Sequence, residues 1–376
     1  MPGPPFQSFV ECCRRRVTPE TCPNARLVGS NIPIYSGPHL APFLEDSSRI
    51  SRLLNEWNRL LGEGPGVFVI EHAFERLDVI HQMTKCFEAI IAREKMAGTS
   101  RGDHFGDNER IWNSFQKSSI QSPHLFVDYY GNRLIALACR AWLGPHYQLT
   151  AQVNNVKPGS DAQSPHRDYH LGFQSNEVIG SFPESAQTMS QHLTLQGAVA
   201  HSDMPVESGP TRLLPFSQRF AAGYRHFRDP AFSDYFEAHA VQLPLSKGDL
   251  LFFNPALFHA AGSNRSANDR MANLLQISSA FGRAMESLDR LAMITAVYPE
   301  LIRRHQAETL PEALLETSAT ALADGYAFPT NLDSDPPIDG NAPRTQRSYL
   351  LQAVRENWPW PHLQKTLSEL ARRRCA

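Results

Sequence analysis

The chain has 376 residues, 41% of them hydrophobic, and a formal net charge of −2 at neutral pH. This length leaves room for one large domain or two small ones, and the apolar fraction is sufficient for a substantial core. The balanced charge, with no stripe of Lys and Arg among aromatic residues, argues against a nucleic-acid partner. No apolar run approaches the roughly 20 residues of a membrane span, so we expect no membrane association.

The cysteines point to a reducing environment. All six are scattered along the chain, without the paired spacing of a zinc site or a disulfide framework. The N-terminus carries basic residues but no apolar run after them, and it therefore does not read as a signal peptide. We expect a cytoplasmic protein.

The N-terminal part is predicted to be mainly helical. Residues 1–44 are rich in Pro and turn-forming residues and read as an extended arm. A short apolar strand is expected at 67–70. Residues 98–124 form either a lid or an irregular packed loop. Three amphipathic helices are predicted, and they cover about 46–61, 77–97 and 124–143.

From Tyr147 onward the hydrophobic pattern changes to short strands separated by Gly and Pro turns. Such a series favours an antiparallel sandwich or barrel of the jelly-roll type. Six strands are predicted, at 147–156, 192–201, 210–215, 238–245, 250–253 and 271–280.

Helical spacing returns over 284–327 and, after a Pro-rich loop, over 345–356 and 361–374. These apolar helices could cover the core or serve an interface between copies, and the oligomeric state stays open. We predict an α+β fold, a mainly β core with flanking helices, in a single domain. Its parts are an N-terminal arm and helix (1–59), the β core with its packing helices (60–282) and a C-terminal helical cover (283–376).

A metal site is suggested by His166-Arg167-Asp168, which follows a predicted strand. In an extended segment, side chains two positions apart point to the same face, so His166 and Asp168 would project together and Arg167 would turn away. An imidazole and a carboxylate are two of the three ligands in the two-histidine, one-carboxylate site of non-haem Fe(II) enzymes. Taken alone, so short a pattern is more often a surface or hydrogen-bonded pair.

A third ligand is expected on a late strand that faces the first. His259 follows the apolar strand 250–253 and a Pro bend, and small residues surround it. Arg270 lies downstream, at the start of the last predicted strand. A buried Arg at that place could form a two-pronged hydrogen-bonded pair with a carboxylate.

Taken in order, four elements resemble the phytanoyl-CoA dioxygenase family. They are His166-x-Asp168, the Glu207–Ser217 segment with its Gly-Pro turn, the Gly248–Phe253 strand, and His259 with Arg270. The resemblance covers roughly residues 60–282. It implies a double-stranded β-helix (jelly-roll, cupin-like) and a dioxygenase that depends on Fe(II) and on 2-oxoglutarate as co-substrate.

The resemblance also implies roles for single residues. His166, Asp168 and His259 would bind the iron and act as the catalytic centre, and Arg270 would pair with the distal carboxylate of 2-oxoglutarate. Lys157 matches a basic residue near the co-substrate in some members. The usual reaction converts 2-oxoglutarate and O2 to succinate and CO2 while a C–H bond of the substrate is attacked. Because a carboxylate occupies position 168, hydroxylation or desaturation is favoured over halogenation.

Two positions depart from the family pattern. Ala198 stands where many members have an aromatic residue, and Ala261 stands where some have Ser. Other co-substrate contacts are therefore expected, from Gln152, Thr194 or Gln196. The substrate would be a small organic molecule, and a secondary-metabolite intermediate is preferred because no cluster for a coenzyme A phosphate is apparent. Five residues are proposed to line its pocket: His104, Phe105, Trp112, His170 and Phe173.

Two alternatives stay open at this point. One is a catalytically silent β-helix protein that serves as a binding or scaffold module. The other is a cupin-like metalloenzyme that does not use 2-oxoglutarate, in which His170 or His192 would be a ligand. His201 is interpreted as a structural histidine.

Overall fold

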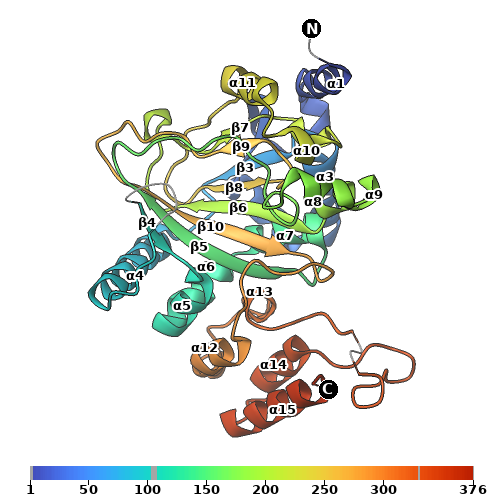
Figure 1. Ribbon diagram of the computed structural model, residues 1–376. Helices are drawn as coiled ribbons and strands as arrows, with labels where there is room; N and C mark the ends of the chain where they lie inside the picture. The colour runs from blue at the N-terminus through green and yellow to red at the C-terminus, as the bar shows by residue number, and fades with distance from the viewer. Residues whose placement is uncertain (1–2, 103–107, 329–330, 376) are drawn as a thin grey trace.

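The computed structural model describes residues 3–102, 108–328 and 331–375, and its centre is a large twisted sheet (Figure 1). The strand order is β1-β2-β3-β8-β6-β10-β5-β4, and a second sheet pairs β7 with β9. All neighbours are antiparallel except β2 and β3. The strands are β1 Leu27–Gly29, β2 Ile32–Ser36, β3 Val67–Glu71, β4 Glu109–Ile111, β5 Gln148–Val156, β6 Thr194–Ala200, β7 Arg212–Leu213, β8 Leu250–Phe253, β9 His259–Ala260 and β10 Arg270–Ser278.

The large sheet has two distinct faces. One register row runs Ile34, Val69, Leu251, Ala198, Leu274 and Gln152. The apolar members of this row pack with Leu213 of β7 and Leu257, so this face, called the inner face below, is turned toward the β7–β9 sheet. The outer face carries apolar residues that helices cover: Phe68, Leu195, Val199, Phe252 and Leu275. Two sheets closing around one interior define the predicted jelly-roll core, with helices on its outside.

Most of the helices cover the outer face of the large sheet, whereas α1 and α11 pack beside β9. The helices are α1 Pro4–Cys13, α2 Gly37–Leu40, α3 Ser47–Gly62, α4 Leu77–Met96, α5 Ser114–Gln121, α6 Pro123–Tyr130, α7 Arg133–Leu143, α8 Asn176–Ser181, α9 Glu184–Ser190, α10 Gly223–His226, α11 Pro230–His239, α12 Arg290–Gln306, α13 Glu312–Leu322, α14 Gln346–Arg355 and α15 Trp360–Arg373. Figure 1 shows α12–α15 together on the side away from β7 and β9. Their apolar residues, such as Val297 and Leu350, join the same core cluster as Leu275. Among the helices of the described residues, none combines the length and apolarity that a bilayer crossing requires.

Capping residues explain where the helices begin. Asp46 caps α3, as predicted, because its carboxylate accepts hydrogen bonds from the backbone N–H groups of Ser48 and Arg49. The helix predicted over 124–143 is instead two helices, α6 and α7. Asn132 separates them, since its side chain accepts from the N–H groups of the first turn of α7.

Three further predictions about elements were wrong. Residues 238–245 do not form a strand: α11 extends to His239, and only isolated bridges at Val241 and Leu245 follow. The described part of 98–124 contains β4 and α5 rather than an irregular loop. Residues 1–44, predicted as an extended arm, contain the helix α1 as well as β1 and β2, and β2 pairs with β3.

Candidate metal centre

Backbone pairing brings His166 and His259 together. The N–H of His166 donates to the carbonyl of His259 at 3.0 Å, and the N–H of His259 donates to the carbonyl of His166 at 3.1 Å. Two residues that exchange both hydrogen bonds stand directly opposite each other in an antiparallel pair, so their side chains emerge on the same side. The N–H of Asp168 donates to the carbonyl of Pro255 at 3.0 Å, which ties the third residue to the bend before β9.

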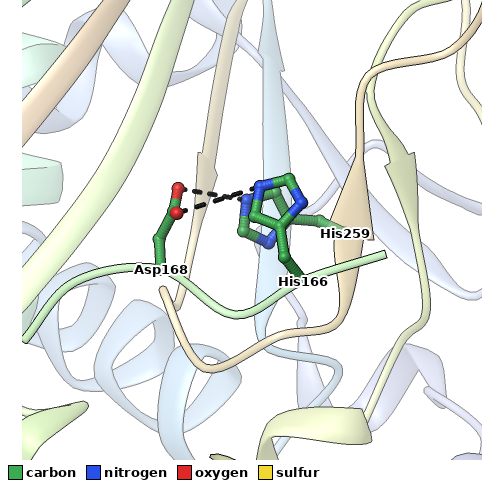
Figure 2. Close-up of side chains that lie close together, drawn as sticks. All are labelled: His166, Asp168 and His259. Atoms are coloured by element: carbon green, nitrogen blue, oxygen red, sulfur yellow. Dashed lines mark ion pairs between the residues drawn. The ribbon is translucent and has the colours of Figure 1, made fainter. Parts of the chain in front are cut away.

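The three side chains converge on one point (Figure 2). Nε2 of His166 lies 3.8 Å from one carboxylate oxygen of Asp168, and Nε2 of His259 lies 3.4 Å from the other. Each residue offers one atom that could bind a metal, and these three atoms lie within 4.8 Å of one another. This is the only such group of three among the described residues. The pair predicted at 166 and 168 and the third residue predicted at 259 thus come together in space.

Each histidine is oriented by its second ring nitrogen. Nδ1 of His166 is 2.9 Å from the carbonyl of Ser164, and Nδ1 of His259 is 2.8 Å from the carbonyl of Leu257. A carbonyl only accepts, so both Nδ1 atoms carry the proton and both Nε2 atoms keep a free lone pair. Hydrogen bonds of this kind hold metal-binding imidazoles in their tautomer and orientation. Burial lowers the pKa of His166, and the neighbouring His259 lowers it further, which favours the neutral ring that a metal requires.

The carboxylate of Asp168 is held in its ionised form. Burial opposes its charge, but the proximity of the His259 and His166 rings and the amide of Gln196 together lower the pKa of Asp168 to about 2. The Nε2 group of Gln196 donates to Asp168 from the inner face of β6. The chain then turns sharply, with positive φ angles at Tyr169 and His170. Backbone strain of this kind is common beside functional groups.

Arg167 points away from the triad, as predicted, but it does not face solvent. Its side chain is only 2% exposed, and one guanidinium nitrogen donates to the carbonyls of Ser217 and Phe220 at 2.7 and 2.9 Å. The guanidinium also lies over the rings of Tyr224 and Phe258. Arg167 therefore anchors the segment that carries the first two triad residues to the neighbouring loop.

Arg270 is buried without a carboxylate partner among the described residues. It is 6% exposed, lies on the inner face at the start of β10, and donates from one nitrogen to the backbone carbonyls of Ser208 and Gly262 at 3.2 and 3.5 Å. No Asp or Glu of the described residues forms an ion pair with it, and burial lowers the pKa of Arg270 to about 10. A buried guanidinium without counter-charge is costly, so this side chain is suited to an anionic ligand.

The other proposed co-substrate residues lie at different places. Gln196 and Thr194 lie on the inner face of β6, and Gln152 lies on the same face of β5. The amide of Gln196 reaches the triad, whereas that of Gln152 reaches Glu286. Lys157 forms ion pairs with Glu109 at 2.7 Å and Asp269 at 2.6 Å, which already compensate its charge.

The proposed pocket residues are only partly described. His104 and Phe105 lie outside the described residues. Trp112 donates from its ring to the carbonyl of Arg101 at 3.1 Å, and the guanidinium of Arg110 lies over its ring. His170 is half-buried, with no hydrogen-bond partner for its Nε2 among the described residues, and burial lowers the pKa of its ring. Phe173 is 64% exposed.

The histidines of the cupin-like alternative lie elsewhere. His201 has both ring nitrogens engaged, with Thr84 at 2.9 Å and Tyr129 at 2.7 Å, on the outer face. His192 stacks on Trp142. Among the described residues, neither His170 nor His192 belongs to the group of converging ligand atoms.

Glu286, which precedes α12, was not predicted from the sequence. Its carboxylate accepts from the backbone N–H of Asn113 and from the Gln152 amide. No local motif marks this residue, because its position depends on three segments that are distant in the sequence.

The donor set fits iron. Two neutral imidazole nitrogens and one carboxylate oxygen on one side of a metal are the ligands typical of non-haem Fe(II), and they leave other positions open. The lone guanidinium of Arg270 on the inner face fits a 2-oxo acid that carries a second carboxylate. The residues present therefore fit both groups.

Comparisons with known proteins agree with this geometry. The family model of phytanoyl-CoA dioxygenase (PhyH) matches residues 63–272. The chain is 31% identical to "Dioxygenase trt7" of Aspergillus terreus over 131 residues, which are 35% of this chain and 40% of that protein. It is 24% identical to "Dioxygenase olcK" of Penicillium canescens over 282 residues, which are 72% of this chain and 79% of that protein.

A solved structure is also similar. The non-heme alpha-ketoglutarate-dependent carbocyclase SnoK from nogalamycin biosynthesis aligns over 61% of this chain and 86% of its own, with 20% identity and a TM-score of 0.46. The match to trt7 spans less than half of that relative's length. The family match spans more than half of this chain, so the chain belongs to the phytanoyl-CoA dioxygenase family.

Proposed function

We propose that this chain is an Fe(II)- and 2-oxoglutarate-dependent dioxygenase that attacks a C–H bond of a small organic molecule by hydroxylation or desaturation. The observation that carries the proposal is the convergence of His166, Asp168 and His259, with both histidines fixed to present Nε2. No comparable observation favours a silent scaffold protein or a cupin-like enzyme without 2-oxoglutarate.

Each residue has a distinct task in this proposal. His166, Asp168 and His259 hold the metal, and Gln196 keeps the Asp168 carboxylate in place through its amide. Arg270 binds the distal carboxylate of 2-oxoglutarate and fixes how the co-substrate lies. When bound, iron and 2-oxoglutarate supply the chemistry that activates O2, with succinate and CO2 as products. Apolar residues such as Leu251 on the inner face and Leu213 of β7, which packs with it, keep the interior dry.

The test is succinate formation from 2-oxoglutarate with a panel of small metabolites under air. Turnover should require added Fe(II) and disappear in His259→Ala and Asp168→Ala. His124→Ala, which removes an exposed histidine, is the matched control and should keep wild-type turnover. Thermal unfolding of each variant checks that it folds. Absence of iron-dependent succinate in the wild type with every compound, or equal turnover in Asp168→Ala, would contradict the proposal.

A further inference from the structure

Glu286 is a carboxylate at the β5 end of the inner face. Its Oε1 accepts from the backbone N–H of Asn113 at 2.6 Å and from the Nε2 group of Gln152 at 3.4 Å. Gln152 lies in the same register row as Leu274 and Ala198 and so projects from the inner face. Glu286 therefore reaches the same interior from which Gln196 holds Asp168.

The second carboxylate oxygen of Glu286 has no hydrogen-bond partner in the described part of the chain. Oε2 is buried and accepts no hydrogen bond from any described residue, and no Lys, Arg or His among them forms an ion pair with this carboxylate. A buried charge without compensation is costly and is kept where a ligand completes it. Burial raises the pKa of Glu286, while the hydrogen bonds from Asn113 and Gln152, the charge of Lys117 and the backbone of Ala151 act in the opposite direction.

Glu286 lies within reach of a molecule bound at the triad. Gln152 and Gln196 lie two strands and two residues apart on the sheet, a separation of roughly 12 Å between their backbones. The charges of both carboxylates act on Tyr169, which follows Asp168: burial raises the pKa of its hydroxyl, and the charges of Asp168 and Glu286 raise it further. A small molecule can span this distance with one end near the metal ligands.

The inner face near the two sites carries buried polar atoms that a ligand can contact. Oε1 of Gln196 and Oε1 of Gln276 are buried without partners among the described residues, and the two residues are register neighbours on the inner face. An amide can present either its oxygen or its nitrogen, but a carboxylate only accepts when it is ionised. Glu286 is thus the fixed acceptor in this interior.

We propose that Glu286 binds the ammonium group of an amine substrate and directs a C–H bond of that molecule toward the His166-Asp168-His259 centre. This inference deepens the proposed function, because it names the substrate class of the same site. A protonated amine can donate a hydrogen bond to Oε2 and place a positive charge in direct contact with the carboxylate, whereas an alcohol can only donate the hydrogen bond.

The test compares hexylammonium and 1-hexanol, which share a carbon skeleton. Calorimetric titration is carried out anaerobically on protein loaded with Fe(II) and 2-oxoglutarate, for the wild type, Glu286→Gln and Asp289→Asn. Asp289 lies on the same segment, is exposed and caps α12, a role that Asn can also fill. We expect hexylammonium to bind the wild type and Asp289→Asn equally and Glu286→Gln at least about tenfold more weakly. Hexanol binding should not respond to the substitution.

Equal binding of hexylammonium to the wild type and Glu286→Gln, or no preference of the wild type for the ammonium over the alcohol, would overturn the inference. Lack of any hexylammonium binding by the wild type would overturn it as well.

A second readout distinguishes a failure of the amine site from a failure of the proposed function. The visible band of the complex of Fe(II) with 2-oxoglutarate should be the same in Glu286→Gln and the wild type. If that band is absent from both while amine binding still depends on Glu286, the proposed function fails and the amine site stands.

Discussion

Buried polar groups on the two faces of the large sheet differ in the partners that they find within the protein. On the outer face, Asn273 donates to the hydroxyls of Tyr129 and Tyr130 at 3.1 and 3.0 Å and accepts from Ser114 at 3.2 Å. On the inner face, Arg270 has no carboxylate partner among the described residues, and one oxygen of Glu286 accepts no hydrogen bond from them. The polar groups of Asn273 are satisfied within the protein, whereas Arg270 and Glu286 keep polar groups that a ligand can contact.

Replacing Arg270, the buried cation of the inner face, should weaken 2-oxoglutarate binding without lowering the free energy of unfolding. In Arg270→Met, the Kd for 2-oxoglutarate should rise at least about 30-fold, because a buried charge partner is lost. The free energy of unfolding without co-substrate should not fall and should rise by about 1–3 kcal/mol, since an uncompensated buried charge disappears. Calorimetry and urea unfolding measure the two quantities. A variant that binds 2-oxoglutarate as tightly as the wild type would remove Arg270 from the site.

An outer-face substitution should have the opposite pattern. Asn273→Ala removes the partner of three buried hydroxyls and should lower the free energy of unfolding by about 2–4 kcal/mol. Affinity for Fe(II) and 2-oxoglutarate should stay at the wild-type value below the unfolding temperature. A loss of co-substrate affinity in folded Asn273→Ala would break the distinction between the faces.

Gln196 and Gln276 offer a matched pair on the inner face. They are register neighbours, but only Gln196 contacts Asp168. Gln196→Leu should lower the affinity for Fe(II) by about 10–100-fold, the usual effect of losing a group that orients a metal ligand. Gln276→Leu should leave it within about threefold. Anaerobic titration with Fe(II) measures both, and equal effects would show that the Asp168 contact does not matter.

His201 should make the outer face sensitive to acid. Burial lowers the pKa of His201 to about 3, whereas the unfolded residue titrates near 6.5. Below about pH 6.5 the unfolded chain binds a proton that the folded chain does not, so stability present above that pH is lost as the pH falls toward 3, at about 1.4 kcal/mol per pH unit. Urea unfolding as a function of pH measures this slope. His201→Gln should reduce it and the exposed His124→Ala should not; an equal slope in His201→Gln would contradict the account.

The sequence predicts the triad well because each half is local. His166 and Asp168 are two positions apart, and His259 follows a strand and a bend that are visible in the hydrophobic pattern. The burial of Arg167 could not be predicted, since the carbonyls and rings that hold it come from residues 217–258. Glu286 was missed for the same reason: its donors lie on distant segments.

The fold was predicted best where the hydrophobic pattern extends over many residues. The strands β5 and β10 and the helix α4 agree with the pattern to within a few residues. The strand β2 contains Pro33 and lies in a Pro-rich segment, so its pairing with β3 left no clear signal. The prediction of a strand over 238–245 failed because apolar alternation there reflects packing against Leu213 and Met204 through single bridges.

The central claim is that His166, Asp168 and His259 hold the iron to which 2-oxoglutarate binds. The most direct measurement is the visible charge-transfer absorption when 2-oxoglutarate is added to the protein with Fe(II) under anaerobic conditions. We predict a weak band in the wild type and in His124→Ala, and none in Asp168→Ala or His259→Ala. A band of unchanged intensity in both triad variants would contradict the account.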